Sequence, residues 1–214
     1  MTSQDFSLEF NILYNNVSSN QAPGLTEYEK SVFLTQAQEA LVLDLYKGTT
    51  GDSFETTEEV TRYLSSLVKS STLDLSEIPE GFNSFYAYKT TTTIDNLWFI
   101  TYQSGSVRVN NSSRDVIVVP SRQDSLYKDL NNPFRGPTKD RVLVISEDNN
   151  LTLYSKYPIE SFYIKYLMKP NPIVLENSEL EIEGVSGFSV DVPECLHRQV
   201  LLRAVQMAKA VWQS

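Results

Sequence analysis

FNILYNNVSSNQAPGLTEYEKSVFLTQAQEALVLDLY, residues 10–46, contains two amphipathic helix patterns on either side of a polar turn. The first pattern has apolar residues at helical spacing, which place their side chains on one face: Phe6, Phe10, Leu13 and Val17. The sequence Asn-Gln-Ala-Pro-Gly at residues 20–24 ends this pattern. Neither helix carries a side chain suited to catalysis, so the block predicts a docking and framework element.

The second pattern has clear start and stop signals. Thr26 supplies an N-cap hydroxyl, and Glu29 stands three residues later, where its carboxylate can reach back to the cap amide. Gly48 can adopt the left-handed conformation that ends helices. The predicted helix therefore runs from Thr26 to about Tyr46, and its apolar stripe is Phe33, Ala37, Ala40, Leu41 and Leu45.

Composition restricts the class of protein. The 214 residues suffice for one large domain or two small ones, and the 41% apolar content, with 12 Tyr and 10 Phe, predicts a packed core. A formal net charge of −9 argues against a broad phosphate-binding surface. No run approaches the ~20 apolar residues of a membrane span, and the first ten residues lack the features of a signal peptide.

Cysteine and histidine usage excludes most catalytic and metal sites. Cys195 is the only thiol and His197 the only imidazole, so one chain can form neither a disulfide nor a zinc site with several Cys and His ligands. Two residues apart on a helix, they point in directions about 200° apart. We therefore expect a first-turn thiol and a surface or interface imidazole. No catalytic, cofactor-binding or metal-binding residue is assigned, and an enzyme is not expected.

The middle of the chain predicts a sheet. Residues 56–69 form a third helical pattern, and strand-like composition follows from about 84 to 168, with few helices between the strands. This order predicts an α+β fold in which a helical N-terminal segment and a C-terminal helix pack around a mostly antiparallel sheet. We expect three regions: a helical segment at 1–78 for docking, a β-rich region at 79–192, and a C-terminal helix at 193–214 packing on the body.

Two strand hairpins are predicted within the β-rich region. The apolar run Leu97–Tyr102 indicates a strand covered on both faces, and Ser104-Gly105-Ser106 would turn it back into residues 107–109. Residues 141–145 and 151–154 flank a short polar loop and indicate a second hairpin.

A proline-rich loop interrupts the strands. Residues 123–130 have helical character, and two prolines and a glycine then restrict residues 131–137 to a rigid path that presents Phe134 and Arg135. Aromatic and Arg side chains are enriched at binding hot spots, so this loop suits a protein contact. A packed connection in which Phe134 plugs the sheet is the other interpretation.

The C-terminal third combines an acidic strand pattern with a helix. Glu179, Glu181 and Glu183 alternate with Leu180 and Ile182, which suits a solvated acidic sheet edge or, alternatively, a divalent-cation site. The last helix follows Pro193 and has a wide apolar face: Leu196, Val200, Leu201, Ala204, Val205, Met207, Ala208, Val211 and Trp212. Such a face predicts packing against the body and against a neighbouring chain.

Several segments together carry a family resemblance. NNVSSNQAPGLTEYEKSVFLTQAQEALV at residues 15–42 resembles the N-terminal block of virion structural proteins from crAss-like and related tailed phages. The NPF-R-GP loop at 132–137, the hairpin ending at 151–154, YLMKPNPIVL at 166–175 and the closing helix PECLHRQVLLRAVQMAKA fit the same pattern. The family it resembles comprises head–tail connector or neck ring proteins, which assemble as rings beneath the portal.

The resemblance implies a virion location in the neck and synthesis in the host bacterial cytoplasm. It implies a twelve-membered ring that contacts the portal and adjacent ring or tail proteins and lets DNA pass without specific binding. A ring needs two different faces of one subunit to meet. We expect the polar turn and the rigid loop to contact partners: Asn20, Gln21, Pro23, Phe134 and Arg135. Acidic side chains would repel DNA phosphates from the channel: Glu147, Asp148, Glu179, Glu181 and Glu183.

Two other classes of function are considered. A virion-associated hydrolase would need two carboxyl groups roughly 5–9 Å apart in a cleft. A host-interaction module on the virion surface would need an exposed patch of Tyr and Phe.

Overall fold

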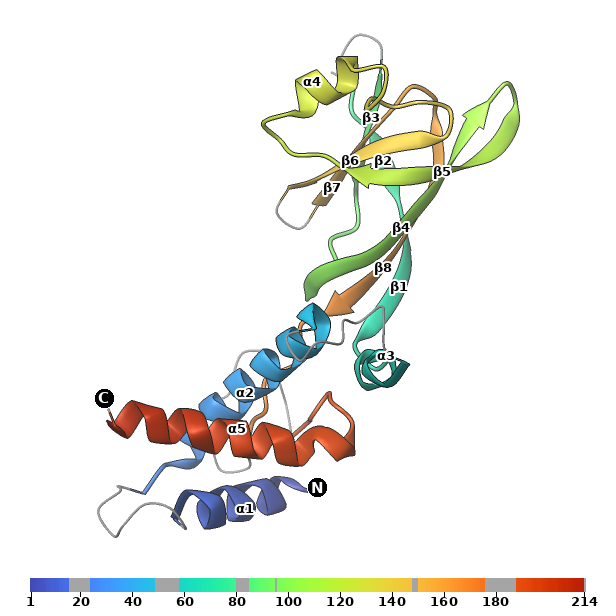
Figure 1. Ribbon diagram of the computed structural model, residues 1–214. Coiled ribbons are helices and arrows are strands. Elements are labelled where there is room, and N and C mark those ends of the chain that lie inside the picture. Colours follow the sequence, from blue (N-terminus) through green and yellow to red (C-terminus); the bar gives the residue numbers. More distant parts are fainter. Residues whose placement is uncertain are drawn as a thin grey trace. The chain divides into compact units, whose positions relative to one another are not determined.

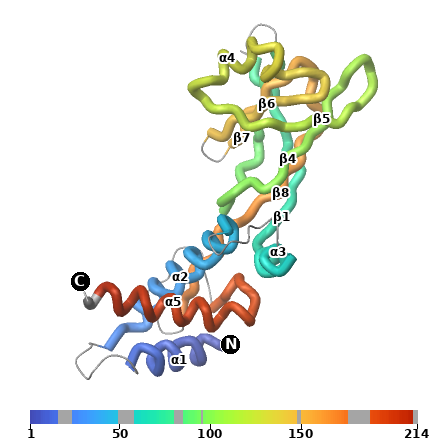
Figure 2. The backbone as a smooth tube through the Cα atoms, in the orientation of Figure 1, coloured from blue at the N-terminus to red at the C-terminus, as the bar shows by residue number. Residues whose placement is uncertain are grey.

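The chain folds into two compact units. This computed structural model describes residues 1–15, 24–48, 58–79, 85–94, 96–147, 150–175 and 188–213. A helical unit comprises Met1–Leu67 and Lys169–Ser214, and a β unit comprises Val68–Met168. The β unit is thus inserted into the sequence of the helical unit, and the colours of Figure 2 follow the chain from the N-terminal helices through the strands to the C-terminal helix. The predicted α+β class is confirmed.

In the described part of the helical unit there are four helices: α1 (Ser3–Asn15), α2 (Glu27–Lys47), α3 (Glu58–Leu64) and α5 (Glu194–Gln213). α5 packs against both α2 and α1 (Figure 1). Phe6 and Phe10 of α1 are fully buried, as predicted, whereas Leu13 is half-buried and Val17 lies outside the described residues. The wide apolar face of α5 is confirmed as far as Ala208, but Val211 is 60% exposed.

The predicted start and stop of α2 are confirmed. Thr26 Oγ1 accepts a hydrogen bond from the Glu29 amide, and Glu29 Oε2 accepts one from the Thr26 amide at 2.8 Å. Gly48 ends the helix with φ at 69°, in the left-handed region. The Thr26 amide and the Thr26 hydroxyl, which donates to Oε2 at 2.9 Å, both lower the pKa of the Glu29 carboxyl, and the backbone bond has the larger effect.

The buried face of α2 differs from the predicted stripe. Phe33, Ala40 and Leu45 are only half-buried, and the buried side chains are instead Lys30, Ser31, Leu34, Ala37, Gln38, Leu41 and Val42. The reason is that α2 uses polar groups to hold an extended segment, residues 171–175. Ser31 Oγ and Thr35 Oγ1 accept hydrogen bonds from the amides of Leu175 and Ile173. Gln38 Nε2 donates to the Asn171 carbonyl at 2.9 Å.

Among its described residues, the β unit has eight strands and one short helix: β1 (Val68–Leu73), β2 (Leu75–Glu77), β3 (Tyr86–Thr90), β4 (Leu97–Val109), β5 (Ser112–Pro120), α4 (Leu126–Asn131), β6 (Arg141–Glu147), β7 (Asn150–Ser155) and β8 (Ile159–Met168). The third predicted helix is therefore too long: it ends at Leu64, and residues 68 and 69 already belong to β1. There, Val68 and Lys69 pair with Leu167 and Tyr166 of β8, and this sheet pairing overrides the helical spacing.

The strands form one sheet in the order β1-β8-β4-β5-β6-β7-β3-β2. Only Asp74 separates β1 from β2, although these strands stand at opposite ends of the order, so the sheet curls until its ends meet. The Thr91 amide donates to the Asp74 carbonyl at that junction. The curled sheet encloses a core that includes Val107, Phe162 and Ile164. A smaller core lies under α4, where Leu126 and Leu130 pack on Leu143 and Ile145.

The predicted antiparallel pairing holds for every strand pair except one. β5 and β6 are parallel, with Ile117 opposite Arg141. Parallel neighbours need a crossover connection of a dozen or more residues, usually helical. Residues 121–140, which include α4, supply this connection. The predicted hairpin of 141–145 with 151–154 is confirmed as β6 and β7.

The other predicted hairpin is wrong. β4 continues through Ser104-Gly105-Ser106, which pair with β8 on one side and β5 on the other. The turn comes later, at Asn110 and Asn111, whose positive φ angles of 48° and 63° suit a tight hairpin. A Cβ at Gly105 would lie 3.0 Å from the Ser161 carbonyl oxygen, so this glycine permits close strand approach. The Leu97–Tyr102 run is half-buried rather than covered on both faces, and Tyr102 is 52% exposed.

Candidate interaction surfaces

The rigid loop after α4 presents an exposed aromatic ring. Phe134 is 84% exposed, and Arg135 beside it is also exposed. The interpretation in which Phe134 plugs the sheet is therefore wrong, and Leu126 and Leu130 of α4 occupy that position instead. We call residues 132–136 the Phe134 loop.

Hydrogen bonds fix the conformation of the Phe134 loop. Asn132 Oδ1 accepts hydrogen bonds from the amides of Phe134 and Arg135, at 2.8 and 3.3 Å. Arg141 Nη2 donates to the Phe134 carbonyl at 2.7 Å. A Cβ at Gly136 would lie 2.7–3.0 Å from three backbone carbonyl oxygens, so only glycine fits there without a shift. The exposed ring is therefore presented by an ordered backbone, which lowers the entropic cost of binding.

The surroundings of the Phe134 loop are basic. Four exposed cationic residues lie in the segment 121–141: Arg122, Lys128, Arg135 and Lys139. Two exposed acidic residues lie in the same segment, Asp124 and Asp140, and Asp140 pairs with Arg114 at 2.6 Å. Tyr127 adds a second aromatic ring, 69% exposed. Aromatic and Arg groups on an ordered loop are typical of an interface anchor.

The acidic charge of the chain is concentrated in the other unit. The sequence range of the helical unit holds 16 of the 27 acidic residues but only seven of the 18 basic residues, which gives it a formal charge of −9. The β unit holds 11 of each and is neutral. The β unit, to which the basic segment around Phe134 belongs, therefore has no net acidic charge to neutralise that segment.

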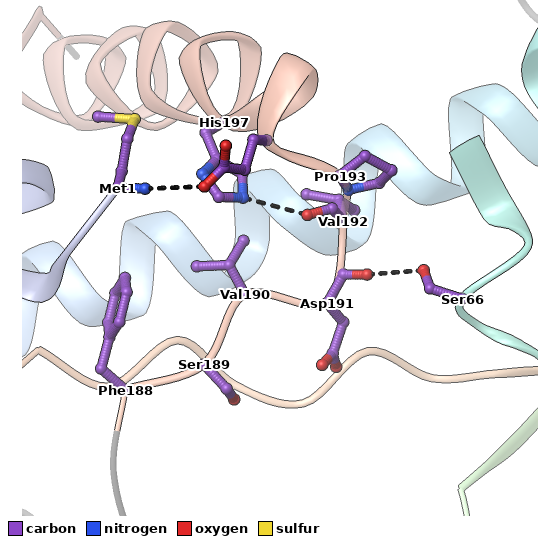
Figure 3. Close-up of a pocket in the computed structure, with 10 residues that line it drawn as sticks. Met1, Ser66, Phe188, Ser189, Val190, Asp191, Val192, Pro193 and His197 are labelled. Carbon is purple, nitrogen blue, oxygen red and sulfur yellow. Dashed lines mark hydrogen bonds and ion pairs between the residues drawn. The ribbon is translucent and has the colours of Figure 1, made fainter. Parts of the chain in front are cut away.

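The helical unit contains a pocket at the start of α5 (Figure 3). Its volume is 510 Å³, within the ~300–1,000 Å³ of typical small-ligand sites. We call it the His197 pocket, and its lining is Met1, Ser66, Phe188, Ser189, Val190, Asp191, Val192, Pro193, Glu194 and His197. Phe188, Val190 and Val192 give it apolar walls, and Asp191 and Glu194 give it carboxylates.

Backbone contacts hold the wall of the pocket in place. Ser66 Oγ donates to the Asp191 carbonyl at 2.8 Å, and Asp191 Oδ2 accepts from the Asn171 amide at 2.6 Å. The Phe188 ring contacts the buried Phe6 ring, with centroids 5.4 Å apart. Glu194 is 86% exposed and lies 3.5 Å from the Met1 amine. Cys195, in the first turn of α5 as predicted, is exposed.

His197 is buried, contrary to the surface or interface position predicted for it. Its side chain is 6% exposed, its ring contacts Phe6, and one ring nitrogen, Nε2, lies 3.1 Å from the Val192 carbonyl. Because a carbonyl only accepts, Nε2 carries the proton and the neutral ring leaves Nδ1 as an acceptor. Nδ1 has no hydrogen-bond partner among the described residues. Burial lowers the pKa of His197, whereas the bond to Val192 acts in the opposite direction.

Of the other residues predicted to contact partners or to line the channel, the structure describes only Glu147. Glu147 is exposed at the last position of β6, where Thr152 Oγ1 contacts its carboxylate at 3.5 Å. The other predicted channel residues, Asp148, Glu179, Glu181 and Glu183, lie outside the described residues, as do the predicted contact residues Asn20, Gln21 and Pro23. The His197 pocket was missed because Phe188 and Val190 resembled an alternating strand, whereas the structure has no strand at 188–192.

Comparison with known proteins identifies the family. The whole chain, residues 1–214, matches the family described as phage tail ring protein 3/4. The chain belongs to this family. It is 39% identical to Ring protein 3 of Bacteroides phage crAss001, over 97% of this chain and 95% of that protein. It is 29% identical to Ring protein 4/5 of the same phage, over 100% of this chain and 94% of that protein. The resemblance found in the sequence is thereby confirmed, and the chain is a structural ring component of a phage particle.

Two further features of the described residues bear on its class. No helix among them has the length and apolar character needed to cross a bilayer. Within the same ranges, no group of three or more His, Cys, Asp or Glu side chains is arranged to hold a metal ion.

Proposed function

We propose that this chain is a non-enzymatic subunit of a connector ring in the neck, made in the host bacterial cytoplasm, which links the portal to the tail and surrounds the DNA channel. The observation that carries this proposal is the full-length match to the ring-protein family. Twelve copies, a portal contact and adjacent ring or tail proteins complete it. The Phe134 loop and the residues Asn20, Gln21 and Pro23, for which the sequence predicts a turn, supply contacts between proteins.

Charge supports the DNA-channel part of the proposal. The acidic excess of the helical unit would repel phosphates within about 8–10 Å of a channel wall at physiological salt. Three of the proposed channel residues, Glu179, Glu181 and Glu183, belong to the sequence range of this unit. Glu147 and Asp148 are proposed to approach the channel from the β unit.

Native mass measurement of the chain, alone and with portal protein, tests the connector role. We expect a twelve-membered ring that binds portal. A chain that stays monomeric and ignores portal, or imaging that places it outside the neck, would overturn the proposal.

Replacing Glu179, Glu181 and Glu183 together by Gln tests the channel role. Rings of this variant should retain more DNA than wild-type rings in a filter assay at low salt. Replacing the same number of exposed acidic residues elsewhere on the helical unit, Glu9, Glu58 and Glu59, by Gln serves as the control for net charge. Equal DNA retention by both variants would contradict a channel position for the three glutamates.

One observation favours a second candidate, a host-interaction module on the virion surface. Four aromatic side chains of the β unit are well exposed: Tyr86, Tyr102, Tyr127 and Phe134. A ring contact would cover Tyr127 and Phe134 in the particle, whereas a host-interaction module would leave them accessible. Surface labelling of a cysteine placed at Tyr127 in intact virions distinguishes the two.

A further inference from the structure

We propose that the Phe134 loop of one copy inserts into the His197 pocket of the neighbouring copy in the ring. This inference rests on the proposed ring function and adds to it the two surfaces that meet. Phe134 would pack against Phe188 and Val190, and Arg135 would lie beside Glu194.

The shapes of the two surfaces fit this arrangement. The Phe134 loop is ordered by hydrogen bonds and exposes one apolar and one cationic side chain. The His197 pocket is concave, and its 510 Å³ volume has room for both side chains. A head-to-tail contact requires two different patches on each subunit, one from each side of the interface. These two patches belong to different units of the chain, so every copy can offer one and receive the other.

The charges of the two surfaces are complementary. The segment 121–141, which contains the Phe134 loop, holds five basic and three acidic residues, and the pocket belongs to the unit whose sequence range carries the entire net charge of −9. Glu194 at the rim is 86% exposed and therefore accessible to an incoming guanidinium. Complementary patches raise the association rate and exclude incorrect partners, because like charges oppose each other in the wrong orientations.

The buried polar group in the pocket points to a donor from outside. Nδ1 of His197 lies on a ring that is 6% exposed and has no hydrogen-bond partner among the described residues. An unpaired buried acceptor is destabilising, and pairing it on binding contributes favourably to affinity. The Phe134 loop brings N–H groups of Arg135 and no additional acidic group to this acceptor.

The native cysteine makes the contact directly testable. Cys195 is exposed and adjacent to Glu194, so an Arg135→Cys substitution would place a second thiol near it across the interface. Assembled rings of the Arg135→Cys variant, treated with oxidant or a short bismaleimide, should give a covalent ladder of subunits. Mixing ¹⁵N-labelled and unlabelled copies identifies links between copies by peptide mass. Tyr102→Cys, on an exposed position of β4, is the matched control and should give no ladder, and Cys195→Ser should abolish it.

A charge exchange provides an independent measurement. Arg135→Glu should raise the concentration needed for half-assembly by about 30-fold, the loss typical of disrupting a hot spot. Combining it with Glu194→Arg should restore most of that loss. Circular dichroism confirms that both exposed substitutions leave the fold intact.

The outcomes separate this inference from the connector proposal. If wild-type chain forms no ring even with portal, both fail. A second set of outcomes is that wild-type rings form while the Arg135→Cys variant gives no cross-link to Cys195, gives one only within single chains, or gives one to a different protein. In each of these cases the ring function stands and this contact is overturned. A ladder between copies together with rescue by Glu194→Arg establishes it.

Discussion

Lys30 is a buried cation that forms an ion pair with Glu27, and the two residues differ in how much their removal should lower the free energy of unfolding. Its side chain is 4% exposed, and Nζ donates to Glu27 Oε1 at 2.7 Å and to Ser7 Oγ at 3.2 Å. Ser7 also donates to Glu27, so one carboxylate joins α1 to α2. Glu27 is 30% exposed and can regain water if the lysine is lost, whereas Lys30 cannot.

This asymmetry predicts unequal effects of removing either partner. Glu27→Gln should lower the free energy of unfolding by about 3 kcal/mol, because it leaves a buried charge uncompensated. Lys30→Met should cost less than that, because an apolar side chain of similar length fills the same space. Urea unfolding of both variants measures the difference. A larger loss for Lys30→Met would contradict this account.

His197 predicts a pH effect on stability. Burial lowers its pKa in the folded state below the ordinary value of 6.5, so the unfolded chain takes up a proton first as pH falls. Above pH 6.5 both states are neutral at this residue and it has no effect. Below pH 6.5 the free energy of unfolding should decrease.

The measurement is the melting temperature of wild type and His197→Gln between pH 7.5 and 5.5. The melting temperature of wild type should fall more over this interval than that of the variant, which lacks the only imidazole of the chain. Parallel curves would show that His197 does not carry the dependence.

At the scale of elements, the start of α2 is determined by adjacent residues. Thr26→Ala removes the hydroxyl that caps the Glu29 amide and should cost about 1 kcal/mol of stability. Thr26→Ser keeps the hydroxyl and should stay close to wild type. Thermal unfolding of the two variants gives the comparison, and equal losses would indicate that the cap contributes nothing.

The same cap shows why some elements could be predicted from sequence and others could not. Thr26, Glu29 and Gly48 act through neighbours along the chain, so their pattern alone locates α2. The length of β4 depends instead on β8 and β5, which lie far away in sequence and pair with Ser104-Gly105-Ser106. A turn signal read locally therefore placed the hairpin too early.

The candidate surfaces divide in the same way. Two prolines and a glycine identified the Phe134 loop from the sequence, because rigid loops have a local signature. The buried face of α2 was misassigned because Ser31, Thr35 and Gln38 bond to a segment more than 130 residues away. His197 was placed at the surface because nothing near it in sequence shows that Phe6 covers it.

For the whole molecule, the separation of charge between the units predicts how assembly responds to salt. Raising NaCl from 0.1 M to 1 M shortens the screening length from about 10 Å to about 3 Å. If the basic Phe134 loop meets the acidic unit of the next copy, assembly should weaken as salt rises. Sedimentation of wild type and Arg135→Glu at both concentrations is the measurement, and the variant should respond less. Stronger assembly at high salt would indicate that like-charged surfaces meet instead.

The junction at Asp74 has a consequence for how copies accumulate. Strands that end a sheet normally expose backbone groups that can template pairing with another molecule. Here those strands are six and three residues long and join each other through Asp74, so the curled sheet offers little backbone for such templating. We expect the newly made protein to form no amyloid-like fibres at high concentration. Association between copies should then depend on contacts between side chains rather than on backbone pairing at a sheet edge.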